Sequence, residues 1–270
     1  MKKFLVGLLT VALAASMLVG CGKKEEKKKA DNSLKDVQSK KELILGLDAS
    51  FPPMGFTDKN QNIVGFDIDL AKEVTKRMGI KLKLQPINWD SKEQELDTGK
   101  IDCIWNGLTM TPERKQKMDF TNPYMNNDQV YVVLKDSPIQ SAEQLKGKNL
   151  CGQEGSTGEA AIEANANLKN SFKDFKLYPD FTSCYMDLDA KRMDAIIIDS
   201  VLANYYQEKA PGKYRTLPGV VVREQFGVGV KKGNTQLVNL LNEGMKKVIA
   251  SGEAAKISQK WFGTNVIVGQ

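Results

Sequence analysis

Histidine is absent from this chain of 270 residues. Its absence excludes Ser-His-Asp and Cys-His catalysis, which need an imidazole as the base, and it excludes metal sites built on histidine. The four cysteines, at positions 21, 103, 151 and 184, do not have the spacing of a metal site either. We therefore expect no catalytic centre of these kinds, no metal and no cofactor.

Long hydrophobic runs are also scarce, and the chain has one only at its start. Lys2 and Lys3 precede the apolar residues 4–19, which are too short for a transmembrane span and have the pattern of an export signal. Residues 18–21, Leu-Val-Gly-Cys, follow a bacterial lipobox. We predict a lipoprotein signal peptide at residues 1–20. We also predict a lipidated Cys21, with palmitate among its acyl chains, as an anchor on the extracellular face of the bacterial cell membrane. The alternative is a plain secretory signal with a chance cysteine.

Net charge is nearly lacking after residue 40. Nine of the 39 Lys and Arg residues and four of the 33 Asp and Glu residues lie in residues 1–40, which leaves 30 basic and 29 acidic residues in the rest of the chain. The folded part therefore has no basic field for nucleic acid. Residues 21–40 are charged and carry almost no large apolar side chain, so we predict a flexible tether there.

Three cysteines remain for the fold if Cys21 is lipidated. Exported proteins can form disulfides, so one disulfide and one buried free thiol is the arrangement that we expect. Our choice for the disulfide is Cys151–Cys184, which leaves Cys103 as the free thiol.

From residue 41 onward, short apolar strands alternate with amphipathic helices. Residues 42–47 and 81–86 have the pattern of strands, and an apolar stripe between them, at residues 66, 70, 74 and 78, has helical spacing. The alternation repeats after residue 150. It predicts an α/β fold of two lobes, each a mostly parallel sheet flanked by helices.

Two extended segments, near residues 129–134 and 225–230, are expected to cross between the lobes as a two-stranded hinge. Lobe 1 then contains residues 41–130 plus 228–270, and lobe 2 contains residues 131–227. We expect a monomer whose lobes open and close as units.

The stretch 104–114, IWNGLTMTPER, reads as a buried strand, a break at Asn106-Gly107 and a new helix. Thr111 suits the N-cap of that helix and Pro112 its first position. Arg114 opposes the helix dipole, but its planar guanidinium can bind both oxygens of a carboxylate. An anion site is therefore one interpretation, and an ordinary junction with Arg114 in water is the other.

Polar and aromatic residues gather at the predicted strand ends and their neighbouring loops. In open α/β sheets, ligands bind beyond the carboxyl ends of the strands. Arg114 and Thr109 suit an α-carboxylate, and Asp199 with the Gly107 carbonyl suits an α-ammonium. The predicted ligand site consists of Asp48, Phe51, Trp89, Asn106, Gly107, Thr109, Arg114, Gln153, Ser156, Thr157 and Asp199. Caps, turns and core packing are the duller explanations for single members of this set.

Eight motifs, in order, resemble those of the bacterial extracellular solute-binding proteins that serve as polar amino-acid receptors of ABC importers. They are GLDASFPPMGF, GFDIDLAKEV, GKID, GLTMTPER, DFTNPY, QEGSTGE, DAIIIDS and KWFG, within residues 41–263. The resemblance implies a two-lobed clamp that closes over a free L-amino acid and delivers it to an ABC permease. It assigns Arg114, Thr109 and Thr157 to the carboxylate, Asp199 and Gly107 to the ammonium, and Asp48, Phe51 and Trp89 to the side chain.

The side chain of the ligand is open at this point. Asp48 and the faces of Phe51 and Trp89 favour a cation, arginine first, while glutamine or cystine is the alternative. Asn106 stands where relatives often carry serine, which puts the specificity in doubt. Asp67 either adds negative charge behind the pocket or caps its helix. The competing class is an enzyme like cyclohexadienyl dehydratase, with Asp48 or Asp67 as the acid; we expect a binding protein instead.

Overall fold

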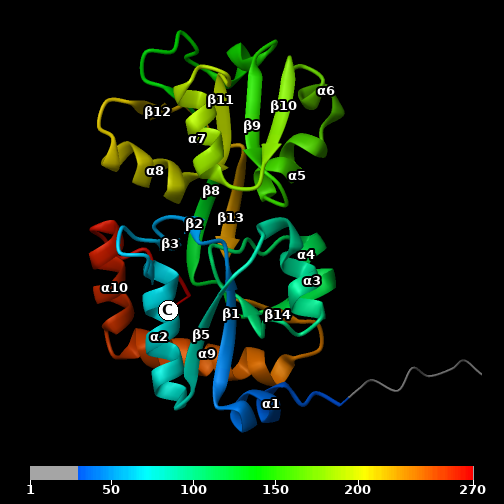
Figure 1. The fold of residues 1–270 in the computed structure, drawn as a ribbon, viewed down its shortest axis with the longest axis vertical. Helices are drawn as coiled ribbons and strands as arrows, with labels where there is room; N and C mark the ends of the chain where they lie inside the picture. Colours follow the sequence, from blue (N-terminus) through cyan, green and yellow to red (C-terminus); the bar gives the residue numbers. More distant parts are fainter. Residues whose placement is uncertain (1–29, 270) are drawn as a thin grey trace, which may run out of the picture. The chain divides into compact units, whose positions relative to one another are not determined.

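Two β-sheets, connected by a pair of antiparallel strands, organise the residues that the computed structural model describes, 30–269 (Figure 1). Residues 31 onward form one compact unit. The predicted signal peptide, the lipid site at Cys21 and residues 22–29 of the predicted tether lie outside the described residues. Among residues 30–269, every helix is too short or too polar to cross a membrane.

The first sheet has the strand order β5-β1-β6-β14-β7. Its strands are β1 (Glu42–Leu47), β5 (Lys81–Pro86), β6 (Cys103–Ile104), β7 (Met118–Phe120) and β14 (Gly229–Lys231). β1 pairs in parallel with β5 and β6, and β14 runs antiparallel to β6 and β7. The strands predicted at 42–47 and 81–86 are confirmed. Leu43, Leu45 and Leu47 are buried because alternate side chains of a strand point to one face.

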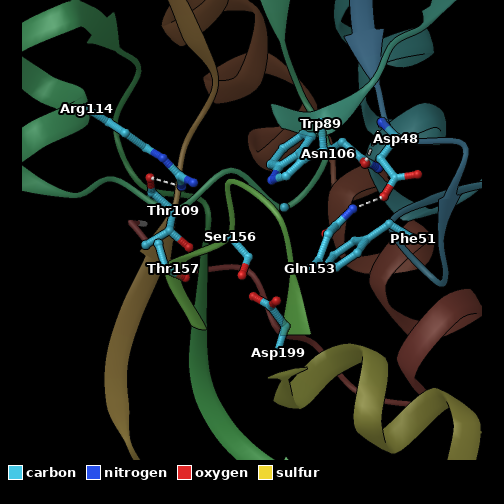
Figure 2. Close-up of a pocket in the computed structure, with 11 residues that line it drawn as sticks. Asp48, Phe51, Trp89, Asn106, Thr109, Arg114, Gln153, Ser156, Thr157 and Asp199 are labelled. Atoms are coloured by element: carbon cyan, nitrogen blue, oxygen red, sulfur yellow. Dashed lines mark hydrogen bonds between the residues drawn. The ribbon is translucent and has the colours of Figure 1, made fainter. Parts of the chain in front are cut away.

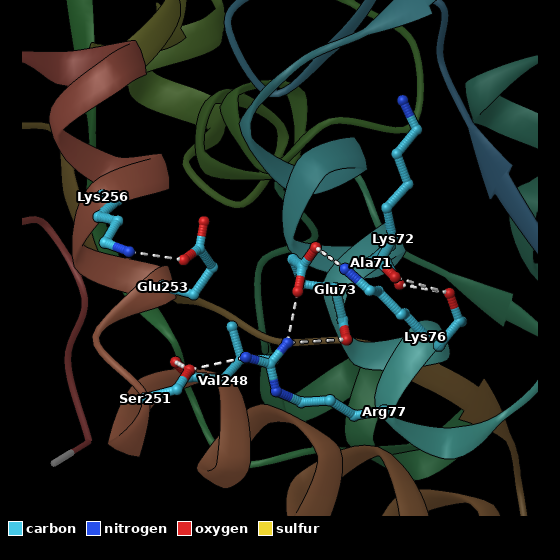
Figure 3. Close-up of polar contacts among 10 residues, drawn as sticks. Ala71, Lys72, Glu73, Lys76, Arg77, Val248, Ser251, Glu253 and Lys256 are labelled. Atoms are coloured by element: carbon cyan, nitrogen blue, oxygen red, sulfur yellow. Dashed lines mark hydrogen bonds and ion pairs between the residues drawn. The ribbon is translucent and has the colours of Figure 1, made fainter.

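Three helices of the first lobe pack on one another: α2 (Phe66–Met78), α9 (Thr235–Ala250) and α10 (Glu253–Phe262). α2 ends at Gly79, which has the left-handed conformation common at helix C-termini. Its predicted stripe buries Phe66, Leu70 and Val74. On the outer side, the Arg77 guanidinium pairs with Glu73 of its own helix and donates to the Ser251 hydroxyl at 2.7 Å, at the end of α9 (Figure 3).

The predicted tether is wrong for its last eight residues, which form α1 (Ser33–Lys40). Val37 is 2% exposed and belongs to the main core. Asp31, just before the helix, accepts hydrogen bonds from the Gln236 amide at 2.7 Å and the Thr235 hydroxyl at 3.0 Å. A buried apolar side chain and several hydrogen bonds to the start of α9 thus hold a segment whose composition is mostly charged.

The second sheet has the order β10-β9-β11-β8-β12, and β13 also pairs with β8. Its strands are β8 (Met125–Leu134), β9 (Asn149–Gln153), β10 (Asp174–Tyr178), β11 (Ala195–Asp199), β12 (Tyr214–Thr216) and β13 (Val222–Phe226). β10, β9 and β11 are parallel, whereas β8 is antiparallel to its three partners. This sheet is therefore mixed, not mostly parallel as predicted, because the long strand β8 pairs with β11, β12 and β13 in the opposite direction. Its helices are α5 (Thr157–Glu163), α6 (Ala166–Lys169), α7 (Phe181–Asp189) and α8 (Ser200–Lys209).

The β8–β13 pair is the connection between the two lobes. Its register runs from Gln129 opposite Val222 to Met125 opposite Phe226. Beyond this ladder the chain passes directly into β7 and β14 of the first sheet. Figure 1 shows both strands running between the two sheets.

The predicted disulfide is wrong: Cys151, Cys184 and Cys103 are free thiols, and all three are buried. Cys151 lies on β9 and Cys184 on α7, within one apolar cluster. Burial, with the neighbouring Cys151 thiol, raises the pKa of Cys184 far above its ordinary value. In such surroundings a thiol packs as a small apolar side chain. The expectation of Cys103 as a free thiol is confirmed.

The remaining elements are short. They are the strands β2 (Ser50–Phe51), β3 (Gly55–Thr57) and β4 (Ile63–Val64), the helices α3 (Lys92–Asp97) and α4 (Pro112–Lys117), and the 3-10 turns η1 (Trp89–Ser91) and η2 (Ala142–Leu145). β2, β3 and β4 form a small antiparallel sheet that follows β1.

The turn into α2 requires a glycine. Gly65 has φ +148°, and a Cβ there would lie 2.2 Å from the Met54 carbonyl oxygen. We expect Gly65→Ala to lower the free energy of unfolding by about 3 kcal/mol or more, since strain and overpacking each cost about 1–3 kcal/mol. Denaturant unfolding measures the loss. Gly79→Ala is the matched control, because its φ is +67° with no atom within 4 Å; a loss of about 1–2 kcal/mol is expected. Equal losses would contradict the steric argument.

Candidate ligand-binding site

One pocket brings together all eleven residues predicted from the sequence (Figure 2). It is nearly filled by its own side chains, with a cavity volume of about 10 Å³. The lining residues are Asp48, Phe51, Trp89, Asn106, Gly107, Thr109, Arg114, Gln153, Ser156, Thr157 and Asp199. Residues of both lobes line the pocket, as expected of a site where the carboxyl ends of β1, β6, β9 and β11 face one another.

Asn106 and Gly107 shape the floor of the pocket where β6 ends. The Asn106 side-chain oxygen accepts from the Asp48 amide at 3.1 Å, which aligns the ends of neighbouring strands. Gly107 has φ +60°, and a Cβ there would lie 2.9 Å from the Phe51 ring. Its N–H donates to Asp67 at 2.7 Å. Asp67 therefore fixes the Gly107 backbone, and the absence of a side chain at Gly107 leaves room for the Phe51 ring.

Asp67 lies behind Gly107 and does not line the pocket. Its carboxylate is fully buried and accepts from the Gly107 N–H and from the Tyr124 hydroxyl at 2.8 Å. Burial raises the pKa of Asp67 to about 7, against the hydrogen bonds from Gly107 and Tyr124. The alternative that Asp67 caps its own helix is wrong, because its side chain accepts from the Gly107 N–H instead. Its role is to fix that loop.

Arg114 is buried in the pocket wall, with 7% of its surface exposed. Thr111 caps the helix by accepting from the Arg114 N–H at 3.1 Å, as its sequence position predicts. The guanidinium donates to two backbone carbonyls, Thr109 at 3.0 Å and Gly155 at 2.9 Å. It has no ion pair within the described part of the chain, so it is available to an anion that enters the pocket.

Asp199 is the last residue of β11, and its carboxylate lines the pocket wall opposite Arg114. Its Oδ1 accepts from the Asn127 side chain at 2.7 Å. Burial, and then the nearby carboxylate of Glu224, raise the pKa of Asp199 to about 7, while Arg114 acts in the other direction. A cationic group placed beside Asp199 would hold it ionised.

Three functional residues were missed from the sequence: Glu224, Asn127 and Gln129, all on the β8–β13 pair. The Glu224 Oε2 accepts from Thr109 Oγ1 at 2.9 Å, Asn127 Nδ2 at 3.0 Å and Gln129 Nε2 at 3.2 Å. Gln129 also donates to the Thr157 hydroxyl at 3.1 Å. This network ties Thr109 of one lobe to Thr157 of the other. No local sequence motif predicts this network, because Glu224 meets Asn127 and Gln129 only when β8 and β13 pair.

Asp48 and Gln153 join the lobes at the other end of the pocket (Figure 2). Gln153 Nε2 donates to Asp48 Oδ2 at 2.7 Å and to the Pro179 carbonyl at 3.0 Å. Burial raises the pKa of Asp48, and the bonds from Gln153 and the Ser50 N–H oppose this. The carboxylate thus already has two donors from the chain itself, which lowers its demand for a ligand donor.

The two aromatic residues have neighbours of their own. The Phe51 ring packs against Phe181 of the second lobe, with 6.0 Å between ring centroids. The Lys92 side-chain nitrogen lies 5.1 Å from the centroid of the Trp89 ring. Trp89 therefore already has a neighbour from the chain at its ring, and Phe51 is the freer of the two rings for a cationic ligand.

The comparison with known proteins identifies the class. Residues 43–264 match the bacterial extracellular solute-binding proteins, family 3, and the chain belongs to this family. The L-cystine-binding protein TcyJ of Escherichia coli (strain K12) is 30% identical over 268 residues, which are 98% of this chain and 97% of TcyJ.

Two further relatives have other ligands. The arginine-binding extracellular protein ArtP of Bacillus subtilis (strain 168) is 30% identical over 264 residues, 97% of this chain and 98% of ArtP. A substrate-binding protein of an ABC uptake transporter from Streptococcus pneumoniae, solved with bound histidine, superposes with a TM-score of 0.85 at 42% identity, covering 89% of this chain and 99% of that chain. These two-lobed proteins confirm the predicted fold class.

Glu224 is expected to control the ionisation of Asp199. Because its negative charge raises the pKa of Asp199, Glu224→Gln should lower that pKa from about 7 while an oxygen remains to accept from Thr109. Carboxyl ¹³C NMR of the ligand-free protein, titrated from pH 4 to 9, measures it. Glu243→Gln, which lies outside this pocket, is the control. An Asp199 pKa unchanged in Glu224→Gln would exclude the coupling.

Proposed function

We propose that this chain is the substrate-binding component of an ABC importer for a free L-amino acid, with arginine as the favoured ligand. The observation that carries the proposal is the charge arrangement of the pocket. The Arg114 guanidinium, which has no ion pair among the described residues, lies on one side, and the carboxylates of Asp199 and Asp48 lie across from it. A zwitterion with a cationic side chain complements all three charges.

The α-carboxylate of the ligand would bind to Arg114 and to the hydroxyls of Thr109 and Thr157. The α-ammonium would bind to Asp199 and the Gly107 carbonyl. The Thr157 hydroxyl accepts from Gln129 and keeps its O–H for the ligand. The Thr109 hydroxyl donates to Glu224 and would turn its O–H from Glu224 to the ligand carboxylate on binding. The relatives support an amino acid as ligand, since their names include cystine, arginine and histidine.

The side-chain end is where arginine competes with other ligands. Asp48 favours a cation and repels a second carboxylate. Its bond to Gln153 equally provides an amide and a carboxylate for a neutral polar side chain, so glutamine or cystine is the alternative. Asn106, with an amide nitrogen that is buried and without a partner among the described residues, adds a donor for such a side chain.

The family places the protein outside the cytoplasm, and we propose that acyl chains at Cys21 hold it on the extracellular face of the membrane. The chain would work as a monomer that docks onto its permease. A dehydratase-like enzyme is the competing class. Of its two predicted acids, Asp48 lines the pocket with a raised pKa and Asp67 does not line it, while Asp199 is a further lining carboxyl group with a raised pKa. Turnover of a cyclic carboxylic acid would support the enzyme. Binding without chemical change supports the receptor.

The test is isothermal titration calorimetry on residues 22–270, stripped of carried ligand by unfolding and refolding. The panel is arginine, lysine, histidine, glutamine, cystine and glutamate. We expect one-to-one binding of arginine with no signal from glutamate. Glutamine or cystine alone would keep the receptor and overturn the cation pocket. If none of the panel binds, the amino-acid receptor is wrong.

Arg114→Ala should weaken binding of every ligand more than about thirtyfold, because truncating one partner of a buried charge pair costs about 2–5 kcal/mol. The same calorimetry measures it, with thermal unfolding to verify the fold. Lys117→Ala, on the same helix but exposed, is the matched control and should bind like the wild type. An Arg114→Ala affinity within twofold of wild type would place the carboxylate elsewhere.

A further inference from the structure

Lys92, the first residue of α3, is buried beside the pocket without lining it. Its surface is 3% exposed, which is rare for a lysine. The side-chain nitrogen donates to two backbone carbonyls, Trp89 at 3.1 Å and Gly155 at 2.9 Å. No carboxylate forms an ion pair with it among residues 30–269. A buried amine bound by two carbonyls needs an explanation.

The Gly155 carbonyl lies where the two lobes meet. It accepts from Lys92 and, also at 2.9 Å, from the Arg114 guanidinium. Lys92 and Arg114 belong to the first lobe, and Gly155 belongs to the loop after β9 in the second lobe. Ser156 and Thr157, which line the pocket, follow Gly155 directly. The position of this one carbonyl therefore sets the position of two residues of the proposed site.

Gly155 is fitted to this contact. Its φ is +68°, and a Cβ there would lie 3.0 Å from the Lys92 nitrogen and 3.1 Å from the Asp90 Cα. Its N–H donates to the Glu159 carboxylate at 2.6 Å. A side chain at this position would push the loop away from Lys92, so the close approach depends on glycine.

The charge state of Lys92 follows from its surroundings. Burial, and then the Arg114 guanidinium, lower the pKa of Lys92 to about 7, while Glu93, Asp90 and Glu159 act in the other direction. An uncharged amine has two N–H donors, and the structure provides two carbonyl acceptors. The contact is thus complete without the charge, and a buried cation next to Arg114 would be costly.

We propose that Lys92 is a positioning residue of the amino-acid site: its uncharged amine joins the Trp89 and Gly155 carbonyls across the lobes and so places Ser156 and Thr157 opposite Arg114. This inference rests on the proposed function and adds a contact between the lobes that makes binding depend on pH. When the lobes separate, Lys92 loses Gly155 and meets water, and its pKa rises toward the ordinary value.

The sign of the dependence follows from the two pKa values. Because the pKa of Lys92 is lower in the joined state, joining releases a proton above pH 7, and affinity rises with pH by at most about tenfold per unit. Below about pH 7 the lysine is protonated in both states and adds no further change. Asp199 contributes in a different pH range. Because a bound ammonium lowers the raised pKa of Asp199, this residue makes affinity fall as the pH drops below 7 and leaves affinity nearly constant above pH 7.

Calorimetry with arginine on residues 22–270, in buffers of different ionisation enthalpy, tests the proposal. We expect release of about 0.9 proton at pH 8 and a rise in affinity of about tenfold between pH 7.2 and 8.4. Lys92→Met should bind at least about fivefold more weakly at pH 8.4 and lose both effects. Lys100→Met, near the end of α3 with an exposed side chain, should match the wild type. Proton release and affinity unchanged in Lys92→Met would overturn the proposal and leave the receptor intact.

A ligand-free measurement separates the two hypotheses. Spin labels at Lys76→Cys and Met186→Cys, exposed positions on different lobes, report the distance between lobes by double electron–electron resonance. The wild-type background should show more of the short distance at pH 8.4 than at pH 7.2, and Lys92→Met should show no change. If no amino acid binds, the receptor is wrong, and these distances still decide the role of Lys92. Identical distances at both pH values in both proteins would refute it.

Discussion

The ladder between β8 and β13 is the constraint on which the rest of the structure depends. It connects the two sheets through neighbouring crossings of the chain, so the carboxyl ends of both sets of parallel strands face one pocket. Glu224 lies in the middle of this ladder and collects hydrogen bonds from Thr109, Asn127 and Gln129. A single buried carboxylate thereby aligns the ligand-facing hydroxyls of both lobes. The network is not complete, because Glu224 Oε1 and Gln129 Oε1 are buried without a hydrogen-bond partner among the described residues.

Buried charge distinguishes this pocket from the surrounding core. Arg114, Asp199, Glu224, Asp48 and Lys92 are all buried, and none of them forms an ion pair with another described residue. Backbone carbonyls and side-chain amides hold them instead. Burial raises the pKa values of Asp48 and Asp199 and lowers those of Lys92 and Arg114. An unsatisfied charge set of this kind is costly for folding and favourable for binding, because a zwitterion supplies the missing partners. Stability is exchanged for recognition at this place.

Much of the fold could be predicted from the sequence where local and tertiary preferences agree. The helix from Phe66 to Met78 has an apolar stripe, an opening glycine and a closing glycine, and all three agree with its final packing. The segment from Ser33 to Lys40 shows the opposite case. Its composition indicates a tether, yet Val37 and Asp31 find partners on α9, some 200 residues away in the sequence. Composition cannot reveal a partner that only the fold supplies.

The candidate site divides in the same way. The sequence by itself determined which residues stand at the strand ends, because strand periodicity, turn glycines and the Thr111-Pro112 helix start are local signals. It could not determine the contacts that run through β8–β13, nor those of Lys92 and Gly155, nor whether Cys151 and Cys184 pack as thiols. Those depend on distances between segments far apart in the chain. A residue type states which bond it can make, and only the tertiary structure decides with which atom.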